Sequence, residues 1–139
     1  MSRAWTPEQL DALEKPVKRT RVGKAVKGGP TERVIQRGIV RSLRQLGFLV
    51  FHVPNGSHLV GGYRQWQALQ ADGAMPGMCD LLIFDRDGEV AALEIKKPGG
   101  VVSADQDACH QALKARRVRV ATVTSLDETL ETLKGWQWV

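Results

Sequence analysis

Two charged residues stand inside an apolar stretch that runs from Ala91 to Lys96. Glu94 and Lys96 are two residues apart, so on a β-strand their side chains point to the same side of the sheet. Removing a charged group from water costs several kcal/mol unless a partner or a ligand compensates. A carboxylate and an amine placed together on a buried face are therefore candidates for metal binding and phosphate chemistry.

A second carboxylate comes from the preceding apolar segment, residues 79–84. Asp80 lies at its start, and the Asp-Gly pair at Asp87–Gly88 predicts a hairpin that joins this segment to residues 89–96. The hairpin would place Asp80 and Glu94 at the same end of the sheet, away from the turn. Carboxylates at such an edge are the ligands that Mg²⁺ takes, together with water and phosphate oxygens.

A site of this kind could hydrolyse a phosphodiester. A bound Mg²⁺ or Mn²⁺ would neutralise the phosphate and lower the pKa of a metal-bound water. Lys96 could position that water or stabilise the charge that develops on phosphorus. A simple ion pair between Glu94 and Lys96 is the alternative for so short a motif, but Val90 and Ala92 on the same face indicate that the face is not solvated.

A predicted helix at residues 31–45, capped by Thr31 and ended by Gly47, carries a third carboxylate. Glu32 falls on the centre line of the apolar stripe of this helix, and Gln36 follows one turn later. An acid in the first turn also suits the helix dipole, whether or not it is buried. Together with Asp80 and Glu94, however, we expect Glu32 to complete the metal site.

Another predicted helix begins at Ser103 and runs to about Ala115. Ser103 and Gln106 fit a capping box, in which the Gln106 side chain bonds back to the Ser103 amide. Gln106 also shares a helix face with His110, one turn later, and is a candidate site residue. We expect His110 to pack or to contact phosphate rather than to bind a metal.

These residues must be positioned by a mixed set of helices and strands. The order helix, strand, helix, strand, strand, helix, strand, helix predicts an α/β fold, with a mixed central β-sheet flanked by helices. The elements are expected at residues 31–45, 48–53, 62–72, 79–84, 89–96, 103–115, 118–123 and 125–133. The last residues, 136–139, are expected to pack back as a final strand, with a dimer contact as the alternative.

The first 29 residues differ in composition from the rest. No acidic residue occurs from Lys15 to Pro30, which predicts a flexible basic arm at 1–29 before one folded domain at 30–139. With a net charge of +5, a phosphate-binding arm and a solubilising tail are about equally favoured. Candidate contacts to phosphate or substrate are Lys15, Lys18, Arg19, Arg21, Lys24 and Lys27 in the arm, and His52, Asn55, His58 and Lys97 in the domain.

The overall composition is that of an ordinary globular protein, with 42% hydrophobic and 25% charged residues among 139. No apolar run reaches the length of a membrane span, and the N-terminus lacks the apolar core of a signal peptide, which predicts a cytoplasmic protein. Cys79 and Cys109 are far apart and are expected to be reduced core thiols rather than a disulfide or a zinc pair.

Taken together, these motifs resemble a known family. They are Glu32 with Gln36, Pro54–Asn55, Gly77–Asp80, Glu94–Lys96 and Ser103–Gln106. From about Thr31 to Leu133 the chain is similar to the VRR-NUC domain (virus-type replication-repair nuclease) of the PD-(D/E)xK nuclease superfamily. Cys79 departs from the family pattern, which often has proline before the aspartate, and its side chain is expected to point to the face opposite Asp80.

The resemblance implies a restriction-endonuclease-like core and a divalent-metal-dependent DNA endonuclease. Asp80 and Glu94 would bind Mg²⁺ or Mn²⁺ with Glu32 as the helix-borne acid, Lys96 would be catalytic, and Gln106 would help to hold the site. The resemblance also implies a homodimer that acts on branched DNA, such as four-way junctions or flaps, in phage-type replication, recombination or repair. The alternatives are a DNA-binding or assembly protein that does not cut, and a sequence-specific restriction-type nuclease.

Overall fold

A mixed four-stranded sheet forms the centre of the computed structural model, which describes residues 20–54 and 62–139. The strands lie in the order β2 (Leu49–His52), β3 (Leu81–Phe84), β4 (Val90–Ile95) and β6 (Arg119–Val123). β2, β3 and β4 pair antiparallel, whereas β6 runs parallel to β4. The predicted α/β class with a mixed sheet is confirmed.

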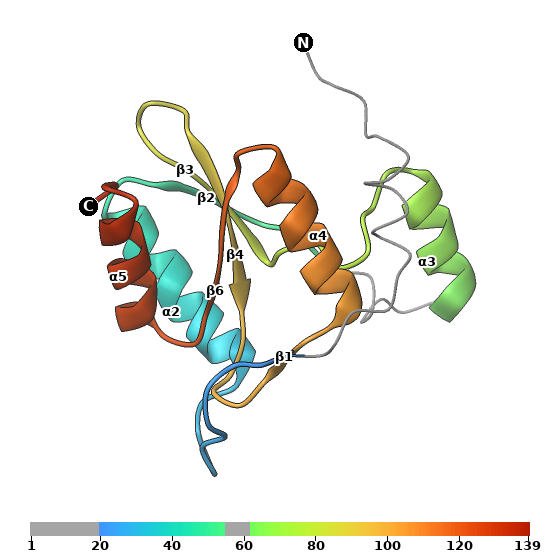
Figure 1. Cartoon of the computed structure of the whole chain (residues 1–139), viewed down its shortest axis with the longest axis horizontal. Helices are drawn as coiled ribbons and strands as arrows, with labels where there is room; N and C mark the ends of the chain where they lie inside the picture. Colours follow the sequence, from blue (N-terminus) through green and yellow to red (C-terminus); the bar gives the residue numbers. More distant parts are fainter. Residues whose placement is uncertain (1–19, 55–61) are drawn as a thin grey trace.

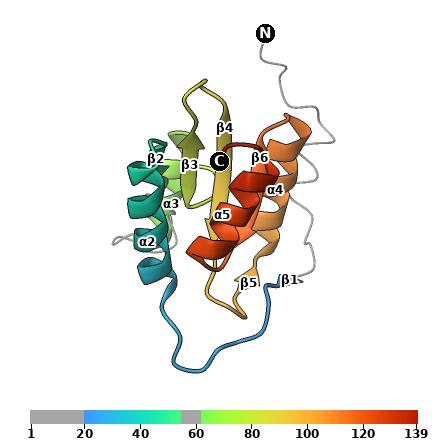
Figure 2. The same cartoon turned by 90° about the vertical axis from the view of Figure 1, so that its left-hand side faces the viewer.

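Helices cover both faces of this sheet. α2 (Glu32–Gln45) and α5 (Leu126–Gly135) pack on one face, and α4 (Ala104–Ala115) packs against β6 on the other (Figure 1). Figure 2 shows α2 and α5 from their own side of the molecule. α3 (Gly62–Ala71) lies beyond α4, away from the sheet. None of the helices in these described ranges is long and apolar enough to cross a membrane.

The main core lies between the sheet and the layer of α2 and α5. Residues that pair across neighbouring strands share a face, so Val50, Ile83 and Leu81 point to this layer. The core residues are Ile39, Leu43, Val50, Leu81, Ile83, Leu93, Ile95, Val123 and Leu133. Because β4 alternates, Glu94 points instead to the opposite face, which α4 covers only in part.

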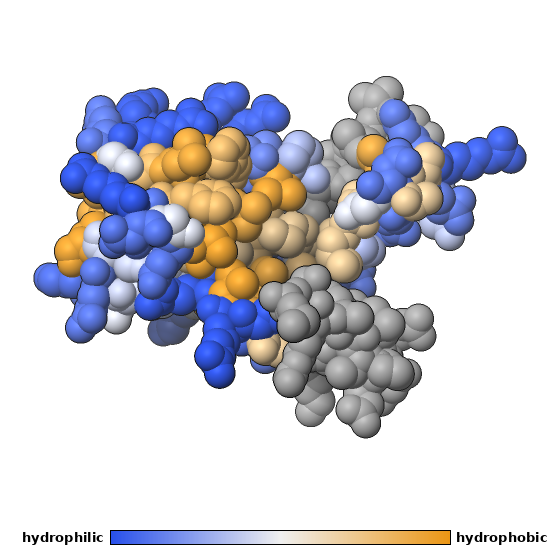
Figure 3. Space-filling view, turned by 90° about the horizontal axis from the view of Figure 1, so that it is seen from above, coloured by the Kyte–Doolittle hydropathy of each residue, from blue (hydrophilic) through white to orange (hydrophobic). Residues whose placement is uncertain are grey.

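The half of that face near β2 carries exposed apolar side chains. β2 is an edge strand, and its Leu49 and Phe51 are 55% and 48% exposed. Phe51 packs against Phe84 of β3, edge to face, with ring centroids 5.9 Å apart. Seen from above, hydrophobic residues gather in the middle of the molecule within a margin of hydrophilic ones (Figure 3). The described part of the molecule therefore has an exposed apolar area beside β2.

Local sequence explains where the helices begin and end. The Thr31 hydroxyl accepts a hydrogen bond from the Val34 amide at 3.3 Å and caps α2. Gly47 follows α2 with a φ of 93°, a conformation that favours glycine and turns the chain into β2. Both residues act as predicted.

A two-stranded sheet joins the N-terminal segment to the loop that follows β4. β1 (Thr20–Arg21) pairs antiparallel with β5 (Val101–Val102). The Val22 amide extends this pairing and donates to the Gly100 carbonyl at 2.8 Å. The predicted flexible arm is therefore not free over this part, and the folded region begins before residue 30. Residues 1–19 lie outside the described part of the chain.

The Pro-Gly-Gly turn after β4 is occupied by the chain itself. Gly99 has a φ of 81°, and a Cβ at this position would overlap the backbone of Ala25. The backbone that approaches this glycine closely is that of the N-terminal segment.

The prediction of a final strand at residues 136–139 is wrong. α5 continues to Gly135, and Gln137 turns the chain with a φ of 62°. Trp138 then stacks on Phe48 with ring centroids 6.0 Å apart, and its indole nitrogen donates to Glu89 at 3.3 Å. The C-terminal residues thus pack on their own chain, but through side chains rather than as a strand.

Candidate active site

Asp80 and Glu94 lie next to each other at the end of the sheet that is opposite the hairpin turn. The register pairs Leu81 with Leu93, which places the residue before β3 beside Glu94. Oδ2 of Asp80 accepts a hydrogen bond from the Ile95 amide at 2.8 Å. Glu94 is only 1% exposed. The structure therefore brings together the two carboxylates that the sequence predicted to converge.

The close approach of the two acids changes the titration of Asp80. Burial, and after it the charge of Glu94, raise the pKa of Asp80 from 3.8 to about 6. The hydrogen bond from the Ile95 amide and the charge of Lys96 act in the opposite direction. An ionised pair at this site is therefore unfavourable without a counter-ion, and a divalent cation would supply one.

Lys96 provides part of the missing positive charge. It follows β4, and its Nζ lies 3.6 Å from Oε1 of Glu94. The Lys96 side chain is 11% exposed, so its ammonium group is held at the edge of the site rather than in solvent. Its backbone amide donates to the Val123 carbonyl at 3.0 Å, which continues the pairing of β4 with β6. The strand face that carries Glu94 and Lys96 is thus buried, as the sequence predicted.

Gln106 performs both tasks that the sequence left open. Its side-chain oxygen accepts a hydrogen bond from the Ser103 amide at 2.9 Å, and the Ser103 hydroxyl accepts from the Gln106 amide at 3.2 Å. This is a complete capping box at the start of α4. The side-chain nitrogen of Gln106 donates to Oε1 of Glu94 at 2.8 Å. The helix cap therefore also orients the buried carboxylate.

Replacing Gln106 by glutamate should separate these two tasks. A glutamate keeps the capping box but places a second carboxylate against Glu94, so we expect the free energy of unfolding in EDTA to fall by about 1–3 kcal/mol. Ser103→Ala, which removes only the cap, should cost about 1 kcal/mol with or without metal. Urea unfolding with and without Mg²⁺ measures both. Equal, metal-independent losses would contradict the role of Gln106 at Glu94.

Gly77 allows the loop before β3 to reach this helix cap. Its φ is 74°, and a Cβ at this position would overlap the backbone of Asp105 in the first turn of α4. The loop that leads to Asp80 is thereby packed against the helix end that carries Gln106. This contact gives a physical reason for the glycine in the Gly-Met-Cys-Asp motif.

Cys79 and His110 surround the second oxygen of Glu94. Nε2 of His110 lies 3.6 Å from Oε2 of Glu94, and neither atom has a hydrogen-bond partner among the described residues. The Cys79 sulfur, a Glu94 oxygen and a His110 ring nitrogen all lie within 4.8 Å of one another. The prediction that Cys79 points away from Asp80 and the site is wrong, because Cys79 precedes β3 and strand alternation does not apply there.

The sequence offered no signal for this cluster, since its three residues come from a loop, a strand and a helix. Burial raises the pKa of the Cys79 thiol, so the thiol is neutral in the absence of metal. Sulfur and imidazole are ligands that Zn²⁺ prefers, whereas Mg²⁺ prefers oxygen. Glu94 therefore lies between Asp80, which offers oxygen ligands, and the pair of Cys79 and His110, which offer sulfur and nitrogen ligands.

Glu32 reaches the same rim from α2. A Cβ placed on Gly100 would lie 3.5 Å from Oε1 of Glu32 and 3.3 Å from Cβ of Lys96, so both residues flank this turn. Within residues 20–54 and 62–139, Glu32 makes no direct hydrogen bond or ion pair with Asp80 or Glu94. The acid is thus near the site rather than in contact with the carboxylate pair.

His52 connects the site to α2. Its Nδ1 lies 3.1 Å from the Asp80 carbonyl oxygen and 3.0 Å from Nε2 of Gln36. The side chain is exposed at the end of β2, as expected of a substrate contact. The other predicted contacts divide into two groups. Arg21, Lys24, Lys27 and Lys97 are exposed, whereas Lys15, Lys18, Arg19, Asn55 and His58 lie outside the described residues.

The function of the site has to be inferred from the chemistry of its residues. Comparisons of the chain with protein-family models, with curated proteins and with solved structures found no match. Asp80 and Glu94 offer the hard oxygen ligands that Mg²⁺ and Mn²⁺ take, and burial together with the nearby charge of Glu94 raises the pKa of Asp80. A divalent cation therefore fits the residues that are present.

Proposed function

We propose that this protein is a divalent-metal-dependent DNA endonuclease with a PD-(D/E)xK-type core, similar to VRR-NUC domains. The observation that carries the proposal is the cluster of the half-buried Asp80 with the buried Glu94 and Lys96 at one end of the sheet. Buried carboxylates with a neighbouring lysine are costly for stability, which favours a functional reason for keeping them.

Each residue has a separate role in this proposal. Asp80 and Glu94 hold Mg²⁺ or Mn²⁺, which when bound polarises the phosphodiester and activates a water. Lys96 orients that water and stabilises the negative charge that develops on the phosphate. Gln106 holds the Glu94 carboxylate in place through its 2.8 Å hydrogen bond. Glu32 bounds the site from α2 and is available to bind a metal-coordinated water.

The proposed substrate is branched or otherwise structured DNA, cut by a homodimer. One site per chain hydrolyses one strand, so paired cuts at a four-way junction require two chains. The exposed Leu49 and Phe51 on the edge strand β2 are apolar surface that a second copy could cover. This activity would serve phage-type replication, recombination or repair.

Incubation with defined DNA substrates tests the proposal directly. The purified protein is mixed with linear duplex, single-stranded, flap and four-way-junction DNA, in Mg²⁺, Mn²⁺ or EDTA. We expect cleavage with either metal, none in EDTA, and faster cleavage of branched than of linear DNA. If no substrate is cut with either metal although DNA binds with a steep salt dependence, the protein is a DNA-binding or assembly protein on a similar fold.

A further inference from the structure

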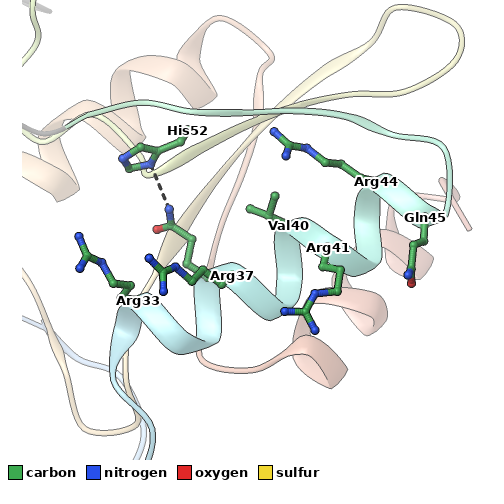
Figure 4. A pocket seen from close by; sticks show the side chains of 8 residues that line it. Arg33, Arg37, Val40, Arg41, Arg44, Gln45 and His52 are labelled. Atoms are coloured by element: carbon green, nitrogen blue, oxygen red, sulfur yellow. Dashed lines mark hydrogen bonds between the residues drawn. The ribbon is translucent and has the colours of Figure 1, made fainter.

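A groove with basic walls runs along the exposed side of α2. Its lining includes Arg33, Gln36, Arg37, Arg41, Arg44 and His52. Figure 4 shows the arginine side chains extending from successive turns of α2, with His52 at the end of β2. None of the residues that line this groove is acidic. The groove is therefore a strongly positive surface.

The arginines follow a helical spacing that keeps them in one row. Arg33, Arg37 and Arg41 are four residues apart, so successive charges are separated by about 6 Å along the helix axis. From Arg33 to Arg44 the row spans about 16 Å of α2. Over that length one strand of a DNA duplex presents roughly five phosphates. The row thus matches a polyanion rather than a single small anion.

Three of these arginines have no partner in the part of the chain that the structure describes. Arg33, Arg37 and Arg41 are exposed and make no hydrogen bond or ion pair with any residue in that part. Arg44 differs, because it donates to the Val50 carbonyl at 3.0 Å. Like charges four residues apart on a helix repel each other. An external anion would relieve this repulsion.

One end of the groove adjoins the candidate active site. Gln36 contacts His52 at 3.0 Å, and the same ring nitrogen lies 3.1 Å from the Asp80 carbonyl oxygen. Arg33 directly follows Glu32, which flanks the Gly100 turn beside Lys96. A strand lying in the groove would therefore lead to the carboxylate pair.

We propose that this groove binds the sugar–phosphate backbone of a DNA strand and guides it to the active site. The inference rests on the proposed nuclease function and assigns the path of its substrate. The predicted phosphate contacts in the N-terminal arm and the loops do not include this row.

The salt dependence of DNA binding tests this assignment. Arg37→Gln/Arg41→Gln and the wild type are titrated with linear duplex and single-stranded DNA in EDTA, between 50 and 300 mM NaCl. If both arginines contact phosphates, the slope of log K against log salt becomes shallower by about 1.8 for duplex or about 1.4 for a single strand. Arg37→Lys/Arg41→Lys keeps both charges and should keep most of the slope. A wild type that binds neither DNA would overturn the proposal.

A matched control removes two charges elsewhere. Lys114 and Arg117 lie at the end of α4, on the opposite face of the sheet from α2. Lys114→Gln/Arg117→Gln should leave the slope unchanged. If the slope becomes shallower by the same amount in both double variants, the effect depends on net charge alone and the groove proposal is rejected. Metal-dependent cleavage is measured separately. If the wild type cleaves DNA but Arg37→Gln/Arg41→Gln leaves the salt slope unchanged, only the groove proposal is rejected. If the double variant has a shallower slope but the wild type does not cleave, only the nuclease proposal is rejected.

Discussion

Lys96→Ala is expected to lower the rate of metal-dependent DNA cleavage by about 100- to 1000-fold, while DNA affinity changes little. The Lys96 ammonium lies 3.6 Å from Oε1 of Glu94, at the place where a phosphate would approach the metal ligands. Removing one preorganised charge from a partly dry active site has an effect of this size on other enzymes. Single-turnover cleavage and equilibrium binding in EDTA measure the two quantities.

The neighbouring lysine offers a control with the same change in net charge. Lys97 is exposed, whereas Lys96 is buried. Lys97→Ala should cut at close to the wild-type rate and lose at most some affinity, mainly at low salt. Thermal unfolding of both variants checks that they fold. A folded Lys96→Ala protein that cuts at the rate of Lys97→Ala would refute the catalytic assignment.

Asp80→Asn is expected to stabilise the metal-free protein at neutral and alkaline pH. Burial and Glu94 raise the pKa of Asp80 from 3.8 to about 6 in the folded state, so folding favours the protonated form. The stability from this group is fully present below about pH 4 and is lost as the pH rises through 6. Allowing for solvent screening of the partly exposed carboxyl, the loss is on the order of 1–2 kcal/mol.

The asparagine side chain suits the same position. Its oxygen can accept the hydrogen bond from the Ile95 amide, and its amide group can donate to Glu94. Urea unfolding in EDTA should give similar free energies of unfolding for both proteins at pH 4, and a more stable variant at pH 8. Added Mg²⁺ should stabilise the wild type but not the variant, because ligand binding favours the folded state.

Asp72→Asn serves as the comparison, since Asp72 is an exposed carboxylate in the loop after α3. This change should leave the difference between pH 4 and pH 8 as it is in the wild type. If Asp80→Asn behaves in the same way, the carboxylate pair is not under electrostatic strain. The argument for a cation between Asp80 and Glu94 would then lose its main support.

Features that depend on a few consecutive residues could be predicted from the sequence. The Thr31 cap, the Ser103 capping box and the hairpin at Asp87–Gly88 were all identified, because hydrogen bonds within four residues determine them. The alternation of a strand and the register of one hairpin were also sufficient to bring Asp80 beside Glu94. The carboxylate pair could be predicted because both acids belong to this one hairpin.

Only the tertiary structure decided the contacts between segments that are distant in the chain. Cys79 and His110 meet at Glu94, and the segment near Ala25 covers the Gly99 turn, because packing of loops and helices on the sheet places them there. No local pattern encodes these approaches. The sequence by itself thus determined which residues form the carboxylate pair. Long-range packing determined what surrounds the pair, and it placed His52 of β2 in the same groove as the arginine row of α2.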